Sequence, residues 1–293
     1  GAMSPGSERR LANSLKLLQG STELFPALIE AMDAAQYQIS LETYIFDFTG
    51  GGEGVALALE RAARRGVLTM VMVDGVGTEA LPPHWAQRFE DAGVQWRVFA
   101  PLGRFGMLDP SRWRRLHRKL CCIDQQVAFC GGINILDDFF DPNHGQLEAP
   151  RFDFAVRITG KLVDDIHDAI AQVWHRNQPN RRLRGAVDAV VQASRNVFRS
   201  HLSELPALPA DGIRSSLVLR DNLRHRSGIE QAYRKAISQA KTEVIIANAY
   251  FVPGRKLRKA LVLAAKRGVK VQLLLQGKYE YFMQYYAARP VYG

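Results

Sequence analysis

Apolar positions in the first hundred residues follow two spacings in turn. Helical spacing occurs in three segments, 21–32, 53–65 and 82–93. Three intervening segments are rich in β-branched and aromatic residues or are nearly continuously apolar, 38–46, 67–73 and 94–99. Ser21 is a typical N-cap residue, and Gly66 and Gly93 follow the second and third helical segments as helix stops. Helices and strands that alternate in this way predict the α/β fold class.

The chain also repeats itself. AARRGVLTMVMVDG (62–75) matches AAKRGVKVQLLLQG (264–277) at an offset of 202, and AAQYQISLETYIF (34–46) matches QAKTEVIIANAYF (239–251) at an offset of 205. Unrelated α/β units can share such patterns, but two matches in the same order favour a duplicated helix–strand–helix–strand unit.

Composition narrows the class of partner. The chain is 47% hydrophobic and has no apolar run of about 18 residues, as is typical of a globular protein. Lysine and arginine exceed the acidic residues by ten, 39 − 29. This balance indicates an anionic partner such as nucleic acid, an anionic membrane surface or a phosphorylated substrate, although charge can also serve solubility alone.

The three cysteines, Cys121, Cys122 and Cys130, do not form a disulfide or zinc pattern. Adjacent cysteines on a strand point to opposite faces, so we expect buried thiols and no metal.

The segment RLHRKLCCIDQQVAFCGGIN, residues 115–134, carries the candidate chemistry. Residues 116–123 predict a strand, so His117 and Lys119 share one face while Arg118 and Leu120 share the other. Asp124 ends this strand, and residues 127–130 predict the returning strand of a hairpin. Gly131 and Gly132 would let the backbone approach a ligand closely, and Asn134 follows them.

These residue types suit phosphoryl chemistry. A neutral imidazole is a nucleophile toward phosphorus, and a nearby lysine attracts phosphate oxygens. Asn134 offers an amide donor, and Asp124 could hold one imidazole nitrogen. Glu42 and Tyr44, two residues apart in an expected strand, could line the same pocket.

The pattern H-x-K-x4-D-x6-G-G-x-N resembles the signature of the phospholipase D superfamily, in the form found in the first half of bacterial cardiolipin synthases. LETYIF (41–46), AARRGV (62–67) and YFVP (250–253) are similar to the same group. The resemblance implies a two-lobed α-β-α sandwich, a duplicated mixed sheet flanked by helices, with one motif from each lobe at a shared site.

The resemblance also implies roles. His117 would be the catalytic nucleophile, Lys119 and Asn134 would bind phosphate, and Asp124 would orient or stabilise the histidine, without metal or cofactor. The reaction would be phosphatidyl transfer that makes cardiolipin from phosphatidylglycerol and a second phospholipid. The enzyme would lie peripherally on the cytoplasmic face of the bacterial inner membrane.

The predicted organisation has four parts. Residues 1–6 resemble an expression scar, 7–176 form the first lobe, 177–212 a basic linker or amphipathic insert, and 213–293 an incomplete second lobe. The helical apolar spacing within the insert fits either a helix lying on an anionic membrane or an ordinary helix packed on the core.

The repeat places a second motif near residue 319, so the chain is expected to be a shortened and inactive form. Two alternatives stay open: a phosphodiesterase acting on nucleic acid, and a fragment that binds anionic lipid without turnover. Residues 176–226 contain only one aromatic residue, Phe198, which does not favour nucleic acid.

Overall fold

The computed structural model describes residues 13–78, 80–101, 115–141, 145–177, 213, 215–218, 228–248 and 253–275. The chain divides into two units, residues 1–217 and 218–293. The insert predicted at 177–212 lies, apart from its first residue, outside the described residues, as do residues 1–6. The domain boundaries drawn around the insert therefore stay predictions.

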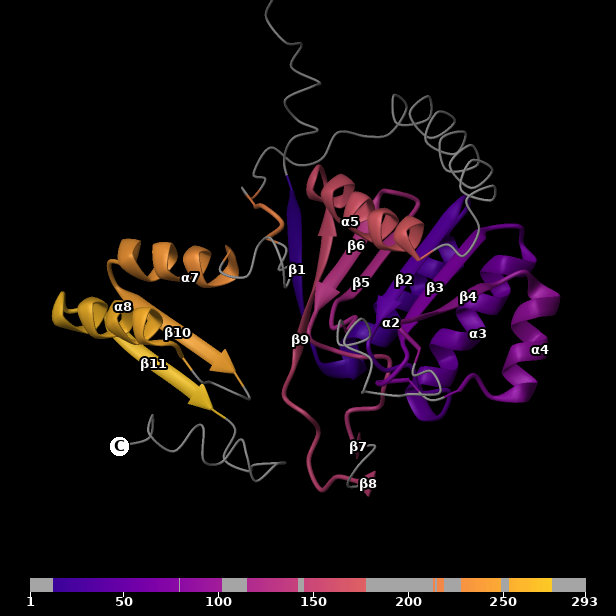
Figure 1. The fold of residues 1–293 in the computed structure, drawn as a ribbon, viewed down its shortest axis with the longest axis horizontal. Coiled ribbons are helices and arrows are strands. Elements are labelled where there is room, and N and C mark those ends of the chain that lie inside the picture. The colour runs from indigo at the N-terminus through magenta and orange to yellow at the C-terminus, as the bar shows by residue number, and fades with distance from the viewer. Residues whose placement is uncertain are drawn as a thin grey trace, which may run out of the picture. The chain divides into compact units, whose positions relative to one another are not determined.

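A seven-stranded mixed sheet forms the centre of the first unit, in the order β1-β9-β6-β5-β2-β3-β4 (Figure 1). Its strands are β1 (Ser14–Gln19), β2 (Gln38–Thr43), β3 (Leu68–Asp74), β4 (Gln95–Phe99), β5 (Lys119–Ile123), β6 (Val127–Gly131) and β9 (Phe154–Thr159). β2, β3 and β4 run parallel, whereas every other neighbouring pair is antiparallel. A small hairpin, β7 (Phe140–Asp141) and β8 (Gly145–Gln146), lies outside this sheet.

Helices cover both faces of this sheet. Among the described residues of the unit they are α2 (Gly20–Ala34), α3 (Gly50–Arg64), α4 (Pro83–Ala92) and α5 (Leu162–Arg176). α2, α3 and α4 share a core with Leu41, Val71 and Cys121 on one face, while α5 packs on Leu120 and Cys122 on the other. The first unit is therefore an α-β-α sandwich, and the predicted α/β class is confirmed.

Two strands are shorter than predicted beside the candidate site. The strand predicted at 38–46 stops at Thr43, and the one predicted at 116–123 begins at Lys119. The reason is that side chains bind the next backbone groups: Asn134 Oδ1 accepts the N–H of Ile45 (3.0 Å), and Asp74 Oδ2 accepts the N–H of Leu116 (2.7 Å). The backbone between the strand ends is thereby shaped by side chains.

The N-cap predicted at Ser21 is wrong, because α2 begins at Gly20 and Gln19 holds the N-cap position. The backbone N–H of Ser21 instead donates to Asp138 Oδ2, a carboxylate 117 residues further along the chain. A negative charge is favourable at a helix N-terminus. The cap is thus supplied by tertiary structure, which local sequence pattern does not reveal.

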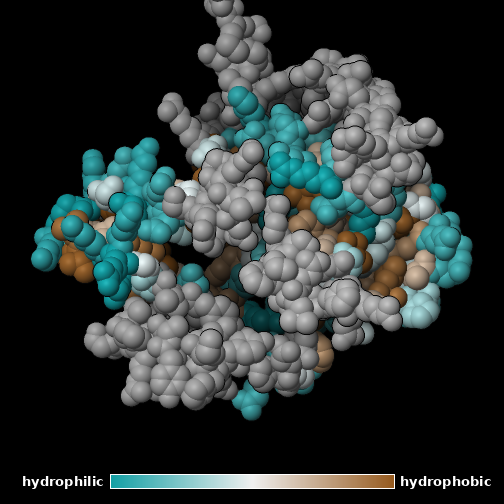
Figure 2. Space-filling model, in the orientation of Figure 1, coloured by the Kyte–Doolittle hydropathy of each residue, from teal (hydrophilic) through white to brown (hydrophobic). Residues whose placement is uncertain are grey.

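The second unit repeats part of the first. It contains α7 (Gly228–Gln239), β10 (Glu243–Asn248), α8 (Arg255–Lys266) and β11 (Lys270–Leu275). β10 and β11 pair in parallel, as β2 and β3 do, and both helices share a small apolar core with them. The outward surface of these helices is mostly hydrophilic (Figure 2).

One arginine contact occurs in both copies. Arg65 Nη2 donates to the carbonyl oxygen of Met32 (2.9 Å), and Arg267 Nη2 donates to that of Ile237 (3.0 Å). The two arginines are 202 residues apart and the two acceptors 205, which are the offsets of the sequence repeat. The contacts therefore confirm the predicted duplication at the level of single side chains.

We expect Arg65→Ala to lower the free energy of unfolding by about 1–2 kcal/mol, because the last carbonyls of α2 lose a charged donor. Urea denaturation is the measurement. The control is Arg61→Ala, which removes only an exposed ion pair with Asp33, for a loss below about 1 kcal/mol. Equal losses in the two variants would contradict a structural role for Arg65.

Candidate active site

His117 lies two residues before β5, beyond the last backbone pair that joins β2 to β5, Glu42 with Leu120. Its ring stacks on Tyr44, with 4.4 Å between ring centroids and 18° between planes. Tyr44 follows the end of β2, so the two rings come from the ends of neighbouring strands. The His117 residue is exposed in the part of the chain that the structure describes.

Lys119 lies on the same side as His117. Its Nζ donates to the carbonyl oxygen of His117 (3.0 Å) and lies 5.6 Å from the centroid of the Tyr44 ring. Arg118 turns the opposite way and binds Glu42. The predicted alternation of these side chains is therefore confirmed. Glu42 and Tyr44 do not line one pocket. Tyr44 lies past the end of β2 and stacks on His117, whereas Glu42 lies on the face of the sheet that α5 covers, called the reverse face from here on.

The imidazole is kept neutral by its surroundings. Burial lowers the pKa of His117 below its ordinary value, and the positive charge of Lys119 lowers this pKa further. Burial also lowers the pKa of Lys119. A histidine that is neutral at pH 7 can act as a nucleophile toward phosphorus, and the adjacent ammonium can stabilise the negative oxygens.

The segment before His117 is anchored by Asp74, which is fully buried at the end of β3. Its carboxylate accepts the backbone N–H groups of Leu116 (2.7 Å) and Val76 (2.8 Å), and Arg115 Nη1 lies 3.3 Å away. These contacts join the loop after β3 to the entry of β5. Asp74 was not found by sequence reasoning, since nothing local marks this carboxylate as a partner of residue 116.

The absence of a side chain at Gly77 leaves the space that Tyr44 occupies. A Cβ atom at Gly77 would lie 2.5 Å from the carbonyl oxygen of Tyr44 and 2.7 Å from its ring. Such distances are shorter than van der Waals contact allows, so a side chain at Gly77 would displace Tyr44 and the imidazole stacked on it.

Asp153, directly before β9, is a second residue that sequence reasoning missed. A Cβ atom at Gly132 would lie 2.2 Å from its carboxylate, so the glycine makes room for Asp153 as well as for any ligand. Burial raises the pKa of Asp153, while the N–H of Phe154 and the charge of Lys119 lower it. The only sequence signal is an acidic residue beside a buried strand, which is too common to identify a partner of Lys119.

Asn134 is turned with its carbonyl oxygen toward the end of β2. Asn134 Oδ1 accepts the N–H of Ile45 at 3.0 Å and lies 3.5 Å from Thr43 Oγ1. In this orientation the NH₂ group is the part of the amide that can donate to a substrate oxygen. Its predicted role in phosphate binding stays a prediction.

The predicted contact between Asp124 and the imidazole is not formed. Asp124 lies at the far end of β5, and seven residues of extended chain correspond to about 20 Å. Its carboxylate accepts three backbone N–H groups, those of Gln36, Tyr37 and Gln38, at 2.8–2.9 Å. Asp124 and Gln125 also have φ near +50°, as a tight hairpin turn requires. Asp124 therefore fixes the hairpin and the start of β2.

The cysteines of β5 are buried on opposite faces of the sheet, as predicted. Burial raises the pKa of Cys122 to about 12 and that of Cys121 well above its ordinary value. Among the described residues, no three histidine, cysteine, aspartate or glutamate side chains are grouped to hold a metal ion.

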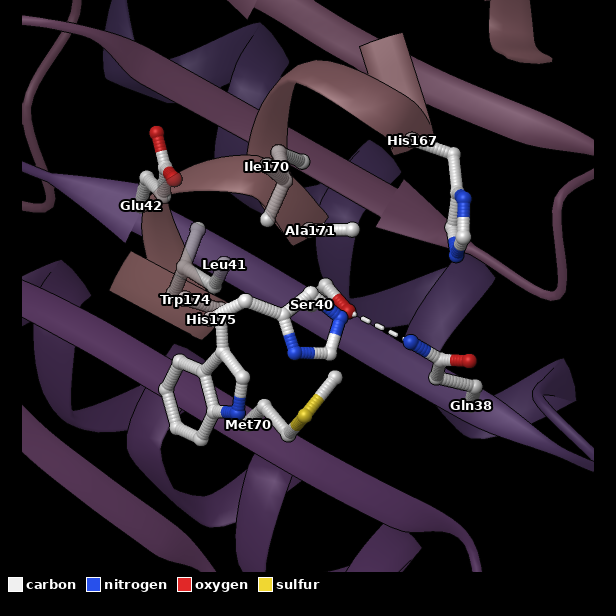
Figure 3. Close-up of a pocket in the computed structure, with 10 residues that line it drawn as sticks. All are labelled: Gln38, Ser40, Leu41, Glu42, Met70, His167, Ile170, Ala171, Trp174 and His175. Carbon is white, nitrogen blue, oxygen red and sulfur yellow. Dashed lines mark hydrogen bonds between the residues drawn. The ribbon is translucent and has the colours of Figure 1, made fainter. Parts of the chain in front are cut away.

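A small cavity lies behind the sheet, between β2, β3 and α5 (Figure 3). Gln38 donates to Ser40 Oγ (2.9 Å) at its wall, and His167 and Trp174 project into it from α5. Its volume of about 10 Å³ is room for roughly one water molecule. The cavity is too small for a phospholipid head group, and it lies on the opposite face from His117.

We expect Lys119→Gln to raise the pKa of His117, because the variant removes a positive charge that disfavours the imidazolium. The measurement is an NMR titration of the histidine ring resonances. Lys16→Gln, which removes an exposed lysine of β1, should leave the pKa of His117 unchanged. An unchanged or lower pKa in Lys119→Gln would show that the two groups do not interact.

We expect Asp124→Asn to lower the free energy of unfolding by about 1–3 kcal/mol, because a charged acceptor of three N–H groups is lost. Guanidinium denaturation measures this loss. The catalytic rate of the folded variant should stay close to that of the parent. A large loss of rate with unchanged stability would instead return Asp124 to the active site.

The comparisons with known proteins agree with this geometry. The family model described as "Cardiolipin synthase, PLD-like domain" matches residues 28–147 and 233–291, one segment in each copy of the repeat. Cardiolipin synthase B of Salmonella typhi is 38% identical over 269 residues, and that of Escherichia coli K12 is 36% identical over 271. In both cases the match covers 92% of this chain and 61% of the relative, so the chain spans about three fifths of their length.

Among solved structures, phosphatidylserine synthase of Haemophilus influenzae Rd KW20 has the same fold, with a TM-score of 0.55 at 15% identity, over 92% of this chain and 65% of that one. The family match covers both copies of the repeat and includes the His117–Asn134 motif. The chain therefore belongs to the cardiolipin synthase PLD-like domain family.

Proposed function

We propose that this protein is a phosphatidyltransferase of the cardiolipin synthase type. It takes a phosphatidyl group from phosphatidylglycerol and transfers it to a second phospholipid, which yields cardiolipin. The observation that carries the proposal is the neutral, exposed imidazole of His117 beside the Lys119 ammonium. The relatives named cardiolipin synthase B supply the substrate class.

The first step forms a covalent adduct. A ring nitrogen of His117 attacks the phosphorus of phosphatidylglycerol, and the bond from phosphorus to the head-group glycerol breaks. Glycerol leaves with a proton from a general acid, and the phosphatidyl group stays on His117. Lys119 and the amide of Asn134 stabilise the charge on the phosphoryl oxygens, and the opposite charge of Asp153 favours the ammonium form of Lys119.

The second step reverses the first with a new alcohol. A hydroxyl of the second phospholipid gives its proton to the same acid–base group and attacks phosphorus, and the bond to His117 breaks. The product is cardiolipin and the imidazole is restored. We assign the acid–base role to the histidine of a second, equivalent motif.

The substrates imply an anionic bilayer surface, and the formal charge of +10 is of the sign that binds one. None of the described helices is long and apolar enough to cross a bilayer. We therefore propose peripheral attachment, at the cytoplasmic face of the bacterial inner membrane.

We expect His117→Ala to reduce cardiolipin formation by more than about 1,000-fold, because the nucleophile is lost. The assay follows cardiolipin by mass spectrometry in phosphatidylglycerol vesicles with chelator present. His84→Ala, which removes an exposed histidine of α4, is the matched control.

Normal cardiolipin formation by His117→Ala would refute the assignment of the nucleophile. Cleavage of plasmid DNA in chelator would instead favour a nucleic-acid phosphodiesterase. Salt-sensitive binding of the parent protein to the vesicles without turnover would favour a lipid-binding role alone.

A further inference from the structure

The position of His117 is not set by the β2–β5 backbone ladder. That ladder runs from Ile39 paired with Ile123 to Glu42 paired with Leu120, and it ends there. His117 and Arg118 lie beyond its last pair. Side chains must therefore hold the strand end that carries the nucleophile against β2.

Arg118 is the side chain that does so on the reverse face of the sheet. Its Nε donates to Glu42 Oε2 (3.0 Å), and its Nη2 donates to Glu42 Oε1 (2.8 Å) and Oε2 (2.6 Å). The same Nη2 donates to the carbonyl oxygen of Ala169 on α5 (3.0 Å). One guanidinium thus joins the entry of β5 to β2 and to the helix behind the sheet.

The ends of β2 and β5 are connected by one contact on each face of the sheet. In front, Tyr44 at the end of β2 stacks on His117. Behind, Glu42 of β2 binds Arg118, the next residue along the chain. A shift of Arg118 away from Glu42 would therefore move His117 relative to Tyr44 and Lys119.

Glu42 is an unusual partner because its side chain is 1% exposed. Burial raises the pKa of Glu42 to about 7, although the charge and hydrogen bonds of Arg118 oppose this shift. Of the neighbouring titratable groups, His167 and His175 of α5 line the cavity that Glu42 borders (Figure 3), and Cys130 of β6 lies near Arg118.

Glu60 provides a contrast. It is also largely buried, with a side chain 9% exposed, but it binds two arginines, Arg64 and Arg88. The hydrogen bond from Arg88 is the main reason that the pKa of Glu60 is lowered. Glu60 lies on α3, away from His117, and so offers a buried ion pair without a link to the site.

We propose that the Arg118–Glu42 pair is a positioning device for the active site, which holds His117 and Lys119 in place when Glu42 is ionised and releases them when it is protonated. The pair does not act on substrate. It acts through the backbone of residues 117–119, from the opposite face of the sheet.

Ionisation of Glu42 lowers the stability of the protein but fixes the position of His117 and Lys119. Because the folded pKa of Glu42 is raised, its contribution to stability is greatest at low pH and is lost as pH rises through about 7. The ion pair with Arg118 forms over the same rise. At neutral pH the protein is therefore less stable, but the end of β5 that carries His117 is fixed. This agrees with the general finding that buried ion pairs seldom stabilise a protein relative to apolar replacements.

The first test is an NMR titration of the His117 ring in the 293-residue chain, with the resonance assigned by its loss in His117→Gln. We expect an inflection near pH 7 from Glu42 in addition to the histidine's own titration. Glu42→Gln should remove this inflection, and Glu60→Gln should not. An inflection that persists in Glu42→Gln would overturn the proposal.

The second test separates position from stability. The double variant Glu42→Leu/Arg118→Met should keep or raise the melting temperature at pH 8, yet lose activity on the order of 10- to 100-fold. If that variant does not fold, Arg118→Lys is used, which keeps the charge but not the bidentate fork. Full activity in whichever variant folds, with an unchanged His117 spectrum, would refute a positioning role.

The activity arm rests on the proposed phosphatidyl transfer, whereas the titration arm does not. If the parent protein makes no cardiolipin but the inflection disappears in Glu42→Gln, the proposed function fails and the positioning pair stands. If the parent makes cardiolipin and the inflection persists, only the positioning pair fails.

Discussion

The buried carboxylate of Asp74 holds the backbone directly before His117. It joins the end of β3 to the backbone of Leu116, one residue before the imidazole. A fully buried carboxylate needs several donors to offset its lost hydration. The loop after β3 supplies two N–H groups, from Val76 and Gly77, and Arg115 adds its guanidinium. Because all of these donors must reach one carboxylate, they fix the backbone after β3 and before His117.

The parts of the site that follow from strand periodicity were predictable. Alternation along residues 117–120 places His117 and Lys119 together and Arg118 behind them, and the contacts with Tyr44 and Glu42 agree. The hairpin of β5 and β6 follows from its apolar runs and the turn between them. Such features depend only on residues that are neighbours along the chain, so they can be predicted from the sequence alone.

Other parts depend on which segments meet in space, and the sequence carries no local mark of them. Asp124 belongs to the same short motif as His117, yet the length of β5 separates them, and its carboxylate binds residues 36–38 instead. Asp153 comes after the hairpin, yet its charge acts on Lys119. The first turn of α2 is capped by Asp138 from far along the chain. The spacing of a motif can therefore identify a protein family, but it does not show that every residue of the motif lies in the active site.

The two thiols inside β5 have a consequence for how this site responds to chemical labelling. Thiolates, not thiols, react with alkylating agents and oxidants, and burial keeps Cys121 and Cys122 protonated at neutral pH. The strand that follows His117 is therefore inert to such reagents while the sheet is intact. Alkylation of these cysteines would report local opening of the sheet, so the rate of their labelling would measure how often β5 separates from its neighbours.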